Sequence, residues 1–239
     1  MSLREVTDES RKVVLLGDSG VGKSSLAMRF TRNEFRPYCE STIGASFMTK
    51  TVTIPASSIV EVESAENQDV GTAEEHEDAK QLNPAQTAAT TASQSRRIEF
   101  KIWDTAGQEK YASLAPMYYR GAAAAILVYD ITNRHSFLVL KTWAEELRSN
   151  GPPDIVLAVC GNKLDLEEAR QISFQEAKDY AAETGAFYIE TSARDDANVE
   201  NMFVELGKRI RVPESTRREE GLTSAVNFGR RGQSSRSCC

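Results

Sequence analysis

Residues 11–24 read RKVVLLGDSGVGKS, an apolar run that leads directly into a glycine-rich loop. The second half of this stretch matches the pattern GxxxxGK(S/T), in which glycines allow consecutive backbone N–H groups to surround a phosphate. Residues 23–32 then have the period of a helix, and a helix start adds free N–H groups and a positive dipole end. Strand, loop and helix follow in the order that a phosphate site needs. We therefore expect a phosphate-binding loop, with an ordinary glycine-rich turn as the alternative.

The loop and the first turn of its helix supply the candidate phosphate ligands. They are Asp18, Ser19, Gly20, Val21, Gly22, Lys23, Ser24 and Ser25. Lys23 is expected to neutralise the β- and γ-phosphates, and Ser24 to place its hydroxyl on Mg²⁺. The motif thus predicts a nucleotide that binds together with Mg²⁺.

A second polar loop, Asp104 to Gln108 (DTAGQ), follows the alternating, strand-like residues 98–104. A carboxylate at a strand end can reach Mg²⁺ through a water, because Mg²⁺ gives up its waters reluctantly. Gly107 would allow its amide to approach a γ-phosphate, and Gln108 would orient the attacking water as the catalytic residue. A capped strand end is the alternative when this motif is taken alone.

A third loop, Asn162-Lys163-Leu164-Asp165, follows the apolar residues 154–161. The Asp165 carboxylate can accept two hydrogen bonds, from N1–H and the exocyclic amino group of guanine. Adenine would leave that carboxylate unpaired, and this penalty produces base selectivity. Asn162, Lys163 and Asp165 are therefore predicted to bind guanine nucleotide, GTP or GDP.

Two further segments complete the predicted site. Ser192, Ala193 and Arg194 follow the last predicted strand, where the Ala193 amide can support the guanine O6. Thr42 lies after the first helix, and its hydroxyl could complete the Mg²⁺ shell when a γ-phosphate is present. Without the other motifs, Thr42 would be taken for an ordinary loop threonine.

Apolar runs alternate with amphipathic segments along most of the chain. The runs predict strands at 11–17, 98–104, 123–130, 154–161 and 186–191, and helices at 23–32, 135–150, 173–184 and 199–211. Ser173 and Glu176 form a capping box at the third helix. The alternation predicts an α/β fold with a doubly wound, mostly parallel sheet and helices on both faces.

Three stretches fall outside this pattern. Residues 1–10 are interpreted as a flexible segment and residues 213–239 as a flexible tail. The residues between them, 11–212, are interpreted as the folded domain, which contains the third stretch. Residues from about 55 to 96 are interpreted as a disordered insertion between the strands of a hairpin. Residues 61–78 are acidic without lysine or arginine, and residues 82–95 carry no charge. Such a segment cannot bury enough apolar surface to offset its ordering entropy. A featureless loop and a partner-binding segment are equally favoured.

Net charge and sequence pattern argue against several classes of protein, although an anionic chain can still carry a local basic face. The net charge of −6 gives no support to nucleic-acid binding, no run of about 18 apolar residues is present, and the N-terminus lacks a secretory signal. Cys39 and Cys160 are isolated and have no metal-ligand spacing, whereas Cys238 and Cys239 end the chain.

The four motifs, in this order, resemble those of the Ras-like small GTPases. The segments STIGASF (41–47), WDTAGQE (103–109) and LAPMYYRGA (114–122) resemble the Rab family, in particular its early-endosomal, Rab five-like branch. The resemblance implies a P-loop small G domain with a six-stranded sheet and a GTP-hydrolysing switch. It also implies that Phe47, Trp103 and Tyr118 form an effector-binding patch. The residues alone place Phe47 and Trp103 in the core, and partial burial is compatible with both interpretations.

The same resemblance implies partners and a location. Cys238 and Cys239 resemble a doubly geranylgeranylated end, and two lipids give durable membrane attachment. It further implies a GAP, an exchange factor, a GDP-dissociation inhibitor and effector proteins. The expected location is the cytoplasmic face of early endosomes, with cycling through the cytosol. Two alternatives are an ATP-using P-loop kinase or ATPase, against which Asp165 argues, and a nucleotide-dependent interaction module with negligible hydrolysis.

Overall fold

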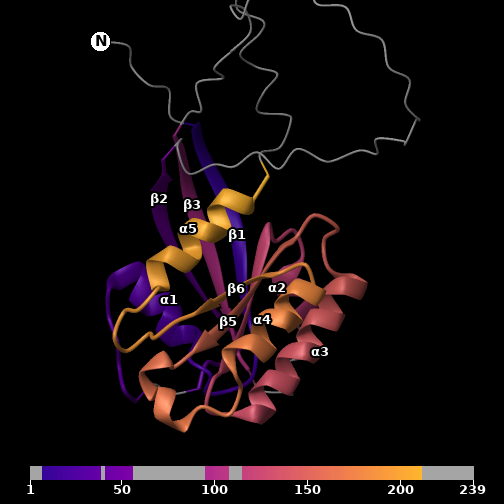
Figure 1. Ribbon diagram of the computed structural model, residues 1–239. Helices are drawn as coiled ribbons and strands as arrows, with labels where there is room; N and C mark the ends of the chain where they lie inside the picture. Colours follow the sequence, from indigo (N-terminus) through magenta and orange to yellow (C-terminus); the bar gives the residue numbers. More distant parts are fainter. Residues whose placement is uncertain (1–6, 39–40, 56–94, 108–114, 212–239) are drawn as a thin grey trace, which may run out of the picture.

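The computed structural model describes residues 7–38, 41–55, 95–107 and 115–211, which place a six-stranded sheet between two layers of helices (Figure 1). The strand order is β2-β3-β1-β4-β5-β6. Neighbouring strands are parallel except β2 and β3, which are antiparallel. The strands are β1 (Thr7–Leu16), β2 (Ala45–Ile54), β3 (Arg96–Thr105), β4 (Ala124–Asp130), β5 (Val156–Asn162) and β6 (Phe187–Glu190). The predicted α/β class and mostly parallel sheet are confirmed.

The helices divide between the two faces of this sheet (Figure 1). One face packs against α1 (Lys23–Arg32) and α5 (Val199–Arg209). The other face packs against α2 (Ala115–Tyr119), α3 (Arg134–Asn150) and α4 (Phe174–Glu183). A short 3-10 helix, η3 (Leu164–Ala169), follows β5. Neither α2 nor η3 was predicted, because segments of five or six residues are too short to show a helical period.

Each face of the sheet carries its own apolar core. On the side of α1 and α5, the ring of Phe30 stacks on that of Phe203 with centroids 3.6 Å apart, and Phe100 packs against both. On the other side, Tyr129 packs against Phe137 with centroids 4.9 Å apart. Every residue of β4 is buried, as expected for a strand covered on both faces. The two cores together fix the ends of the strands, and therefore the loops that follow them.

The N-terminal boundary of the fold differs from the prediction. β1 begins at Thr7 rather than Arg11 and pairs with β3 from Thr7 opposite Arg96. The interpretation of residues 7–10 as flexible is therefore wrong. These residues lack an apolar pattern, but β3 supplies a backbone ladder, and the Glu9 carboxylate accepts hydrogen bonds from Arg96 at 3.0 and 3.2 Å.

The predicted hairpin is confirmed at both its strands. β2 ends at Ile54, which lies opposite Arg96 at the start of β3. Arg96 therefore belongs to a strand and not to the insertion, whose remaining residues 56–94 lie outside the described part of the chain. The two ends of the insertion are thus held side by side, as in an ordinary hairpin.

Helix ends agree with the prediction to within two residues. α1 has the predicted bounds, whereas α5 ends at Arg209 instead of Arg211. Ser173 caps α4, and its hydroxyl accepts the N–H of Glu176 at 3.1 Å. The carboxylate of Glu176 pairs with Arg134 on α3 at 2.6 Å, which joins the two helices.

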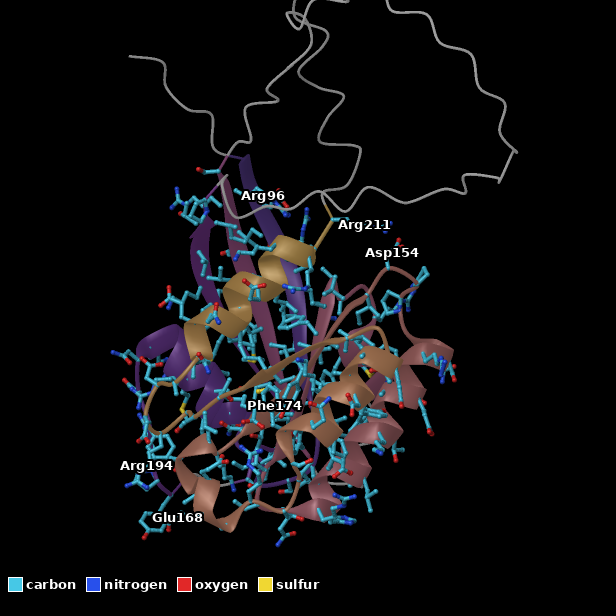
Figure 2. All side chains as sticks on the ribbon, viewed as in Figure 1. Arg96, Asp154, Glu168, Phe174, Arg194 and Arg211 are labelled. Atoms are coloured by element: carbon cyan, nitrogen blue, oxygen red, sulfur yellow. The ribbon has the colours of Figure 1, made fainter. Side chains whose placement is uncertain are left out.

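The topology places the predicted loops at one end of the molecule. Five strands run in parallel, so their carboxyl ends meet at the same edge of the sheet. Arg194 and Glu168 lie at this end, and Arg96 lies at the opposite end (Figure 2). In the described part of the chain, no helix combines the length and apolar character needed to cross a membrane.

Candidate functional site

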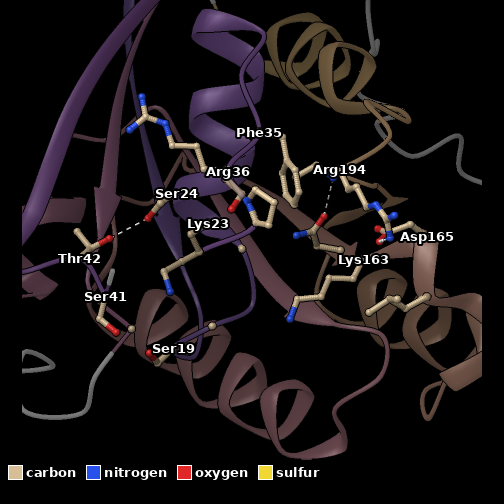
Figure 3. A pocket seen from close by; sticks show the side chains of 18 of the residues that line it. Ser19, Lys23, Ser24, Phe35, Arg36, Ser41, Thr42, Lys163, Asp165 and Arg194 are labelled. Atoms are coloured by element: carbon tan, nitrogen blue, oxygen red, sulfur yellow. Dashed lines mark hydrogen bonds and ion pairs between the residues drawn. The ribbon is translucent and has the colours of Figure 1, made fainter. Parts of the chain in front are cut away.

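A cavity of about 610 Å³ opens at the carboxyl edge of the sheet. It brings together most of the predicted ligands: Ser19, Gly20, Gly22, Lys23, Ser24, Ser25, Thr42, Gly107, Asn162, Lys163, Asp165, Ala193 and Arg194. These residues come from five separate segments. Lys23, Ser24 and Thr42 lie towards one end of the cavity, and Asp165 and Arg194 towards the other (Figure 3).

The first end of the cavity is built by the glycine-rich loop. Gly22, just before α1, has φ of +97°, and a Cβ there would come within 2.3 Å of the Asn162 side chain. Lys23 is buried, and its ammonium donates to the carbonyls of Gly17 at 2.9 Å and Asp18 at 2.6 Å. Burial lowers the pKa of Lys23 to about 8, against the opposing influence of nearby carboxylates. A buried cation whose hydrogen-bond partners are carbonyls suits an anionic phosphate.

Three side chains converge beside Lys23. The Ser24 hydroxyl donates to Oδ2 of Asp104 at 2.5 Å and lies 2.8 Å from the Thr42 hydroxyl. Ser46 also donates to Oδ2 of Asp104, at 3.3 Å. The other carboxylate oxygen, Oδ1, is buried and has no hydrogen-bond partner among the described residues. Burial raises the pKa of Asp104, which a bound cation would oppose. Hydroxyl and carboxylate oxygens are ligands that Mg²⁺ prefers, so this group fits the predicted metal.

Gly107 lies against the glycine-rich loop. A Cβ at this position would come within 2.4 Å of the Asp18 carbonyl and 2.5 Å of the Ser19 nitrogen. The DTAGQ segment can therefore approach the phosphate end only with glycine at this place. The predicted catalytic residue, Gln108, lies outside the described residues, so its role stays a prediction.

The other end of the cavity presents the Asp165 carboxylate. Its Oδ1 accepts a hydrogen bond from Ser192 at 2.7 Å, and its Oδ2 lies 3.7 Å from the guanidinium of Arg194. Neighbouring Lys163 pairs with Asp130 at 2.6 Å. The carboxylate is thus oriented by two residues of the predicted base loop, in a position to accept two donors from a base.

Asn162 connects the two ends of the cavity. Its side-chain amide donates to the Val21 carbonyl at 2.9 Å, and its Oδ1 accepts from the Ala193 N–H at 3.3 Å and the Thr191 hydroxyl at 3.2 Å. One buried side chain therefore holds the phosphate loop and the base loop in fixed relation.

The amino-acid sequence is similar to those of known proteins. The sequence profile of the Ras family matches residues 12–63 and 73–212. The chain belongs to the Ras family. It is similar to the Ras-related protein Rab-22A of Homo sapiens, with 44% identity over 88% of this chain and 86% of that protein. It is also similar to the Ras-related protein Rab5 of Nicotiana tabacum, with 39% identity over the full length of both. The Ras-related protein RABF2a of Arabidopsis thaliana is 42% identical over 95% and 94% of the two chains. The resemblance to the Rab five-like branch is confirmed.

Membership of this family sets the activity. The chain is a small GTPase that binds GTP and GDP with Mg²⁺ and hydrolyses GTP to GDP. It acts as a switch in endosomal trafficking. The alternative of a module with negligible hydrolysis finds no support in these relatives.

Several residues that line the cavity were not predicted. Phe35, Arg36, Pro37, Ser41, Thr105 and Leu166 also line the cavity. The Phe35 ring faces the cavity between its two ends (Figure 3). A planar ring at this place suits the face of a purine. The only sequence signal is an aromatic residue in the otherwise polar segment NEFRP, at residues 33–37.

Three predicted nucleotide-binding residues do not line the cavity. Val21 and Ser192 are buried, and they act through the contacts to Asn162 and Asp165 described above. The Asp18 carboxylate accepts the N–H of Ser19 at 2.6 Å. The Val21 carbonyl and the side chains of Asp18 and Ser192 thus shape the loops that surround the cavity.

The predicted effector patch is a row of three aromatic side chains that runs from β2 through β3 to α2. Phe47 and Trp103 meet edge to face with centroids 5.6 Å apart, and Tyr118 lies 6.1 Å from Trp103. Phe47 is 52% exposed, so placing it in the core was wrong. β2 is an edge strand of the sheet, and Phe47 lies on its solvent-facing row. Trp103 is partly buried, and the ammonium of Lys12 lies 5.0 Å from its ring.

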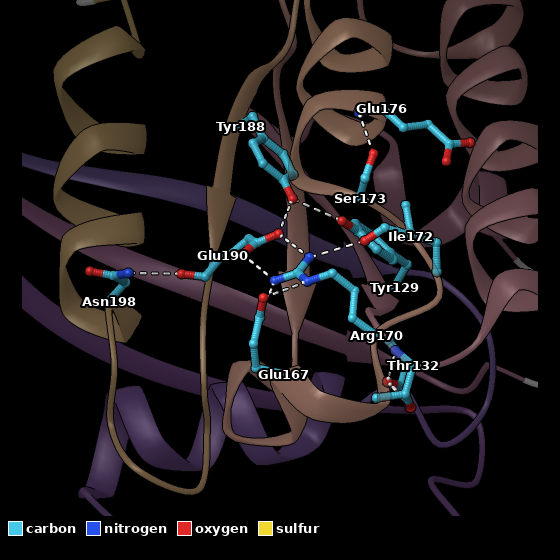
Figure 4. A network of polar contacts seen from close by, with 11 residues as sticks. Tyr129, Thr132, Glu167, Arg170, Ile172, Ser173, Glu176, Tyr188, Glu190 and Asn198 are labelled. Carbon is cyan, nitrogen blue, oxygen red and sulfur yellow. Dashed lines mark hydrogen bonds and ion pairs between the residues drawn. The ribbon is translucent and has the colours of Figure 1, made fainter.

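A network of polar side chains connects η3, β4 and β6 (Figure 4). Arg170, which follows η3, donates to both oxygens of Glu190 at 2.7 and 2.8 Å and also contacts Glu167. The Tyr188 hydroxyl donates to Glu190 and lies 2.9 Å from that of Tyr129. Burial raises the pKa of both tyrosines, so they stay neutral donors. The network ties the segment after Asp165 to the end of β6.

Proposed function

We propose that the cavity holds the nucleotide with its phosphates at the Lys23 end and its guanine at the Asp165 end. The observation that carries this orientation is the convergence of Ser24, Thr42 and Asp104. Ser24 and Asp104 are 80 positions apart in the sequence, yet they bond at 2.5 Å beside the buried Lys23. The Oδ1 of Asp104 has no hydrogen-bond partner in the described part of the chain, which supports a cation at the same place.

Each end of the site then has a separate task. Lys23 neutralises the β- and γ-phosphates, and the amide of Gly107 donates to the γ-phosphate. Ser24 and Thr42 would hold Mg²⁺ through their hydroxyls, and Asp104 would hold it through water. Bound Mg²⁺ neutralises charge on the β- and γ-oxygens. Asp165 accepts N1–H and the amino group of guanine, while the Ala193 amide donates to O6.

The switch follows from which contacts need the γ-phosphate. Thr42 precedes β2, and Gly107 follows β3, so both segments border the aromatic patch on those strands. With GTP, Thr42 and Gly107 are held in place. After hydrolysis, both contacts are lost and the segments are released. Phe47, Trp103 and Tyr118 therefore form a surface that effector proteins bind in the GTP state.

Hydrolysis requires a positioned water and compensation of developing charge. Gln108 orients the water, since an amide is a poor base. No arginine lies in residues 17–25 or next to Gln108, so neither segment supplies an arginine to stabilise the transition state. Intrinsic turnover is expected on the order of 10⁻⁴ to 10⁻³ s⁻¹, as in related enzymes, until a GAP adds an arginine.

The remaining partners act on nucleotide exchange and location. An exchange factor opens the site, and a GDP-dissociation inhibitor carries the GDP form through the cytosol. Geranylgeranyl groups on Cys238 and Cys239 attach the chain to the cytoplasmic face of early endosomes. Mass spectrometry of the C-terminal peptide checks the modification. Changing both cysteines to serine should release the protein from membranes.

The test of the catalytic assignment is the variant Gln108→Leu. We expect single-turnover phosphate release, with and without a GAP, to fall by about 100-fold or more. GTP affinity should stay unchanged, because the variant keeps the residues that bind phosphate and base. Unchanged GAP-stimulated hydrolysis in this variant would show that Gln108 has another role.

A further inference from the structure

Arg29 on α1 connects the phosphate-binding helix to the loop after β6. Its Nε–H donates to the carbonyl of Ala193 at 2.9 Å, and its Nη2 donates to that of Arg194, also at 2.9 Å. Its Nη1 donates to the side chain of Asn33 at 2.9 Å and to the Asn33 carbonyl at 3.2 Å, at the C-terminal cap of α1. The guanidinium is therefore anchored on its own helix while it holds two successive carbonyls of another loop.

The held loop is also joined to β5 and η3, because the Thr191 N–H donates to the Gly161 carbonyl at 2.8 Å and the Ser192 hydroxyl donates to Asp165 at 2.7 Å. Its shape is set internally, since Ser192 and Ala197 exchange two backbone hydrogen bonds at 3.0 and 3.1 Å. The Ala193 N–H makes only a long contact, 3.3 Å, with Asn162 Oδ1, which the Thr191 hydroxyl also contacts at 3.2 Å. Ala193 is nevertheless almost fully buried at the cavity wall. Arg29 adds the two bonds that join this segment to α1 itself, at the carbonyls of Ala193 and Arg194.

We propose that Arg29 is a positioning residue for guanine recognition, which holds the Ala193 N–H in place for the O6 atom of the base. The inference rests on the nucleotide orientation proposed above. Arg29 is not among the described residues that line the cavity, so it acts through the loop. The planar guanidinium presents donors to both carbonyls at once, which the single ammonium of lysine cannot do in the same geometry.

Three nucleotides separate the contact of the base with Asp165 from its contact with the Ala193 N–H, which Arg29 positions. GDP carries N1–H, the amino group and O6. Inosine diphosphate keeps O6 but lacks the amino group that Asp165 binds. 6-Thio-GDP keeps both donors for Asp165 but replaces O6 by sulfur, a weaker acceptor. Each nucleotide competes with ribose-labelled fluorescent GDP for the full chain in Mg²⁺. The variants are Arg29→Gln, Arg29→Lys and the control Arg209→Gln, which removes a partly exposed arginine bonded within α5.

The expected result is a change in preference, not only in affinity. The unaltered protein should prefer GDP to 6-thio-GDP by about ten-fold, the effect of one hydrogen bond to the base. Arg29→Gln should weaken GDP and inosine diphosphate together by about ten-fold and 6-thio-GDP by less than about two-fold. Arg29→Lys should lie between, and Arg209→Gln should match the unaltered protein. Melting temperatures check that each variant is folded.

Two other results would overturn the inference, and they differ. If the unaltered protein binds GDP and 6-thio-GDP equally, the assigned contact between Ala193 and O6 fails, and the role of Arg29 fails with it. If the unaltered protein discriminates and Arg29→Gln discriminates as strongly, only the role of Arg29 fails. An equal loss for all three nucleotides is one form of this second result, and it would make Arg29 a purely structural residue.

Discussion

The two ends of the sheet are built in different ways. At the carboxyl end, loops from distant parts of the chain are joined by side chains: Asp104 meets Ser24, Asn162 reaches the phosphate loop, and Arg29 holds the base loop. At the opposite end, β1, β2 and β3 continue as a regular backbone ladder to Thr7, Ile54 and Arg96. The arrangement of the carboxyl end therefore depends mainly on individual polar contacts between side chains and loops. The arrangement of the opposite end depends mainly on the repeated backbone pairing of strands.

This difference explains where the chain accepts extra length. The strands of this hairpin are paired up to Ile54 and Arg96, so their ladder does not depend on the length of the connection between them. A loop at the carboxyl end cannot change without moving a group that faces the cavity. Changes at the two ends should therefore separate stability from nucleotide binding.

The largest effect is expected at the carboxyl end, for Asp165→Ala. This change removes the acceptor for two guanine donors, and GDP affinity should fall by about 2–5 kcal/mol. Competition binding against fluorescent GDP measures it. Asp195→Ala is the matched control, because Asp195 is exposed and lies next to Arg194. A three-fold loss or less for Asp165→Ala would mean that the base is recognised elsewhere.

A smaller effect, of a different kind, is expected at the opposite end for Arg96→Gln. Arg96 is buried and bonds both oxygens of Glu9 and the Gly207 carbonyl at 3.1 Å. Glu9 keeps its contact with Arg11, so the free energy of unfolding should fall by about 1–3 kcal/mol. Urea unfolding of the GDP-bound protein measures this loss, and Lys101→Gln, an exposed change on β3, is the control. GDP dissociation that is faster by an order of magnitude would show that the two ends are coupled.

The smallest effect on the site is expected when residues 56–94 are replaced by Asn-Gly, a two-residue hairpin turn. GDP dissociation and intrinsic hydrolysis should change by less than about two-fold, because the strands on both sides remain paired. If the segment is disordered as predicted, the shorter loop should raise the free energy of unfolding by roughly 2 kcal/mol. A marked loss of stability would show instead that the segment packs on the domain.

Regular features of this fold could be predicted because they repeat along the sequence. The continuous apolar run of β4 and the helical period of α1 each gave their element within one residue. The polar start of β1 had no such pattern, and only its pairing with β3 makes it a strand. The local sequence pattern therefore predicted the elements that pack in the apolar cores, and it missed strand residues that are ordered only by pairing with another strand.

The residues of the site also fall into two groups, those that the sequence indicates and those that only the fold reveals. Lys23, Asp104 and Asp165 belong to motifs whose spacing follows from the chemistry of phosphate, metal and base, so the sequence alone could indicate them. Phe35 and Arg29 belong to no such motif. Their roles depend on contacts across the fold, with the cavity and with the Ala193 carbonyl, which no local spacing encodes.

The most direct test of the account is a titration of nucleotide-free protein with GDP, in Mg²⁺ and in excess chelator, with ADP as competitor. We expect tight binding in Mg²⁺, a loss of at least about ten-fold in chelator, and no displacement by ADP. Binding that ignores Mg²⁺, or that ADP competes for on equal terms, would contradict the assignment of Asp104 to the metal or of Asp165 to guanine.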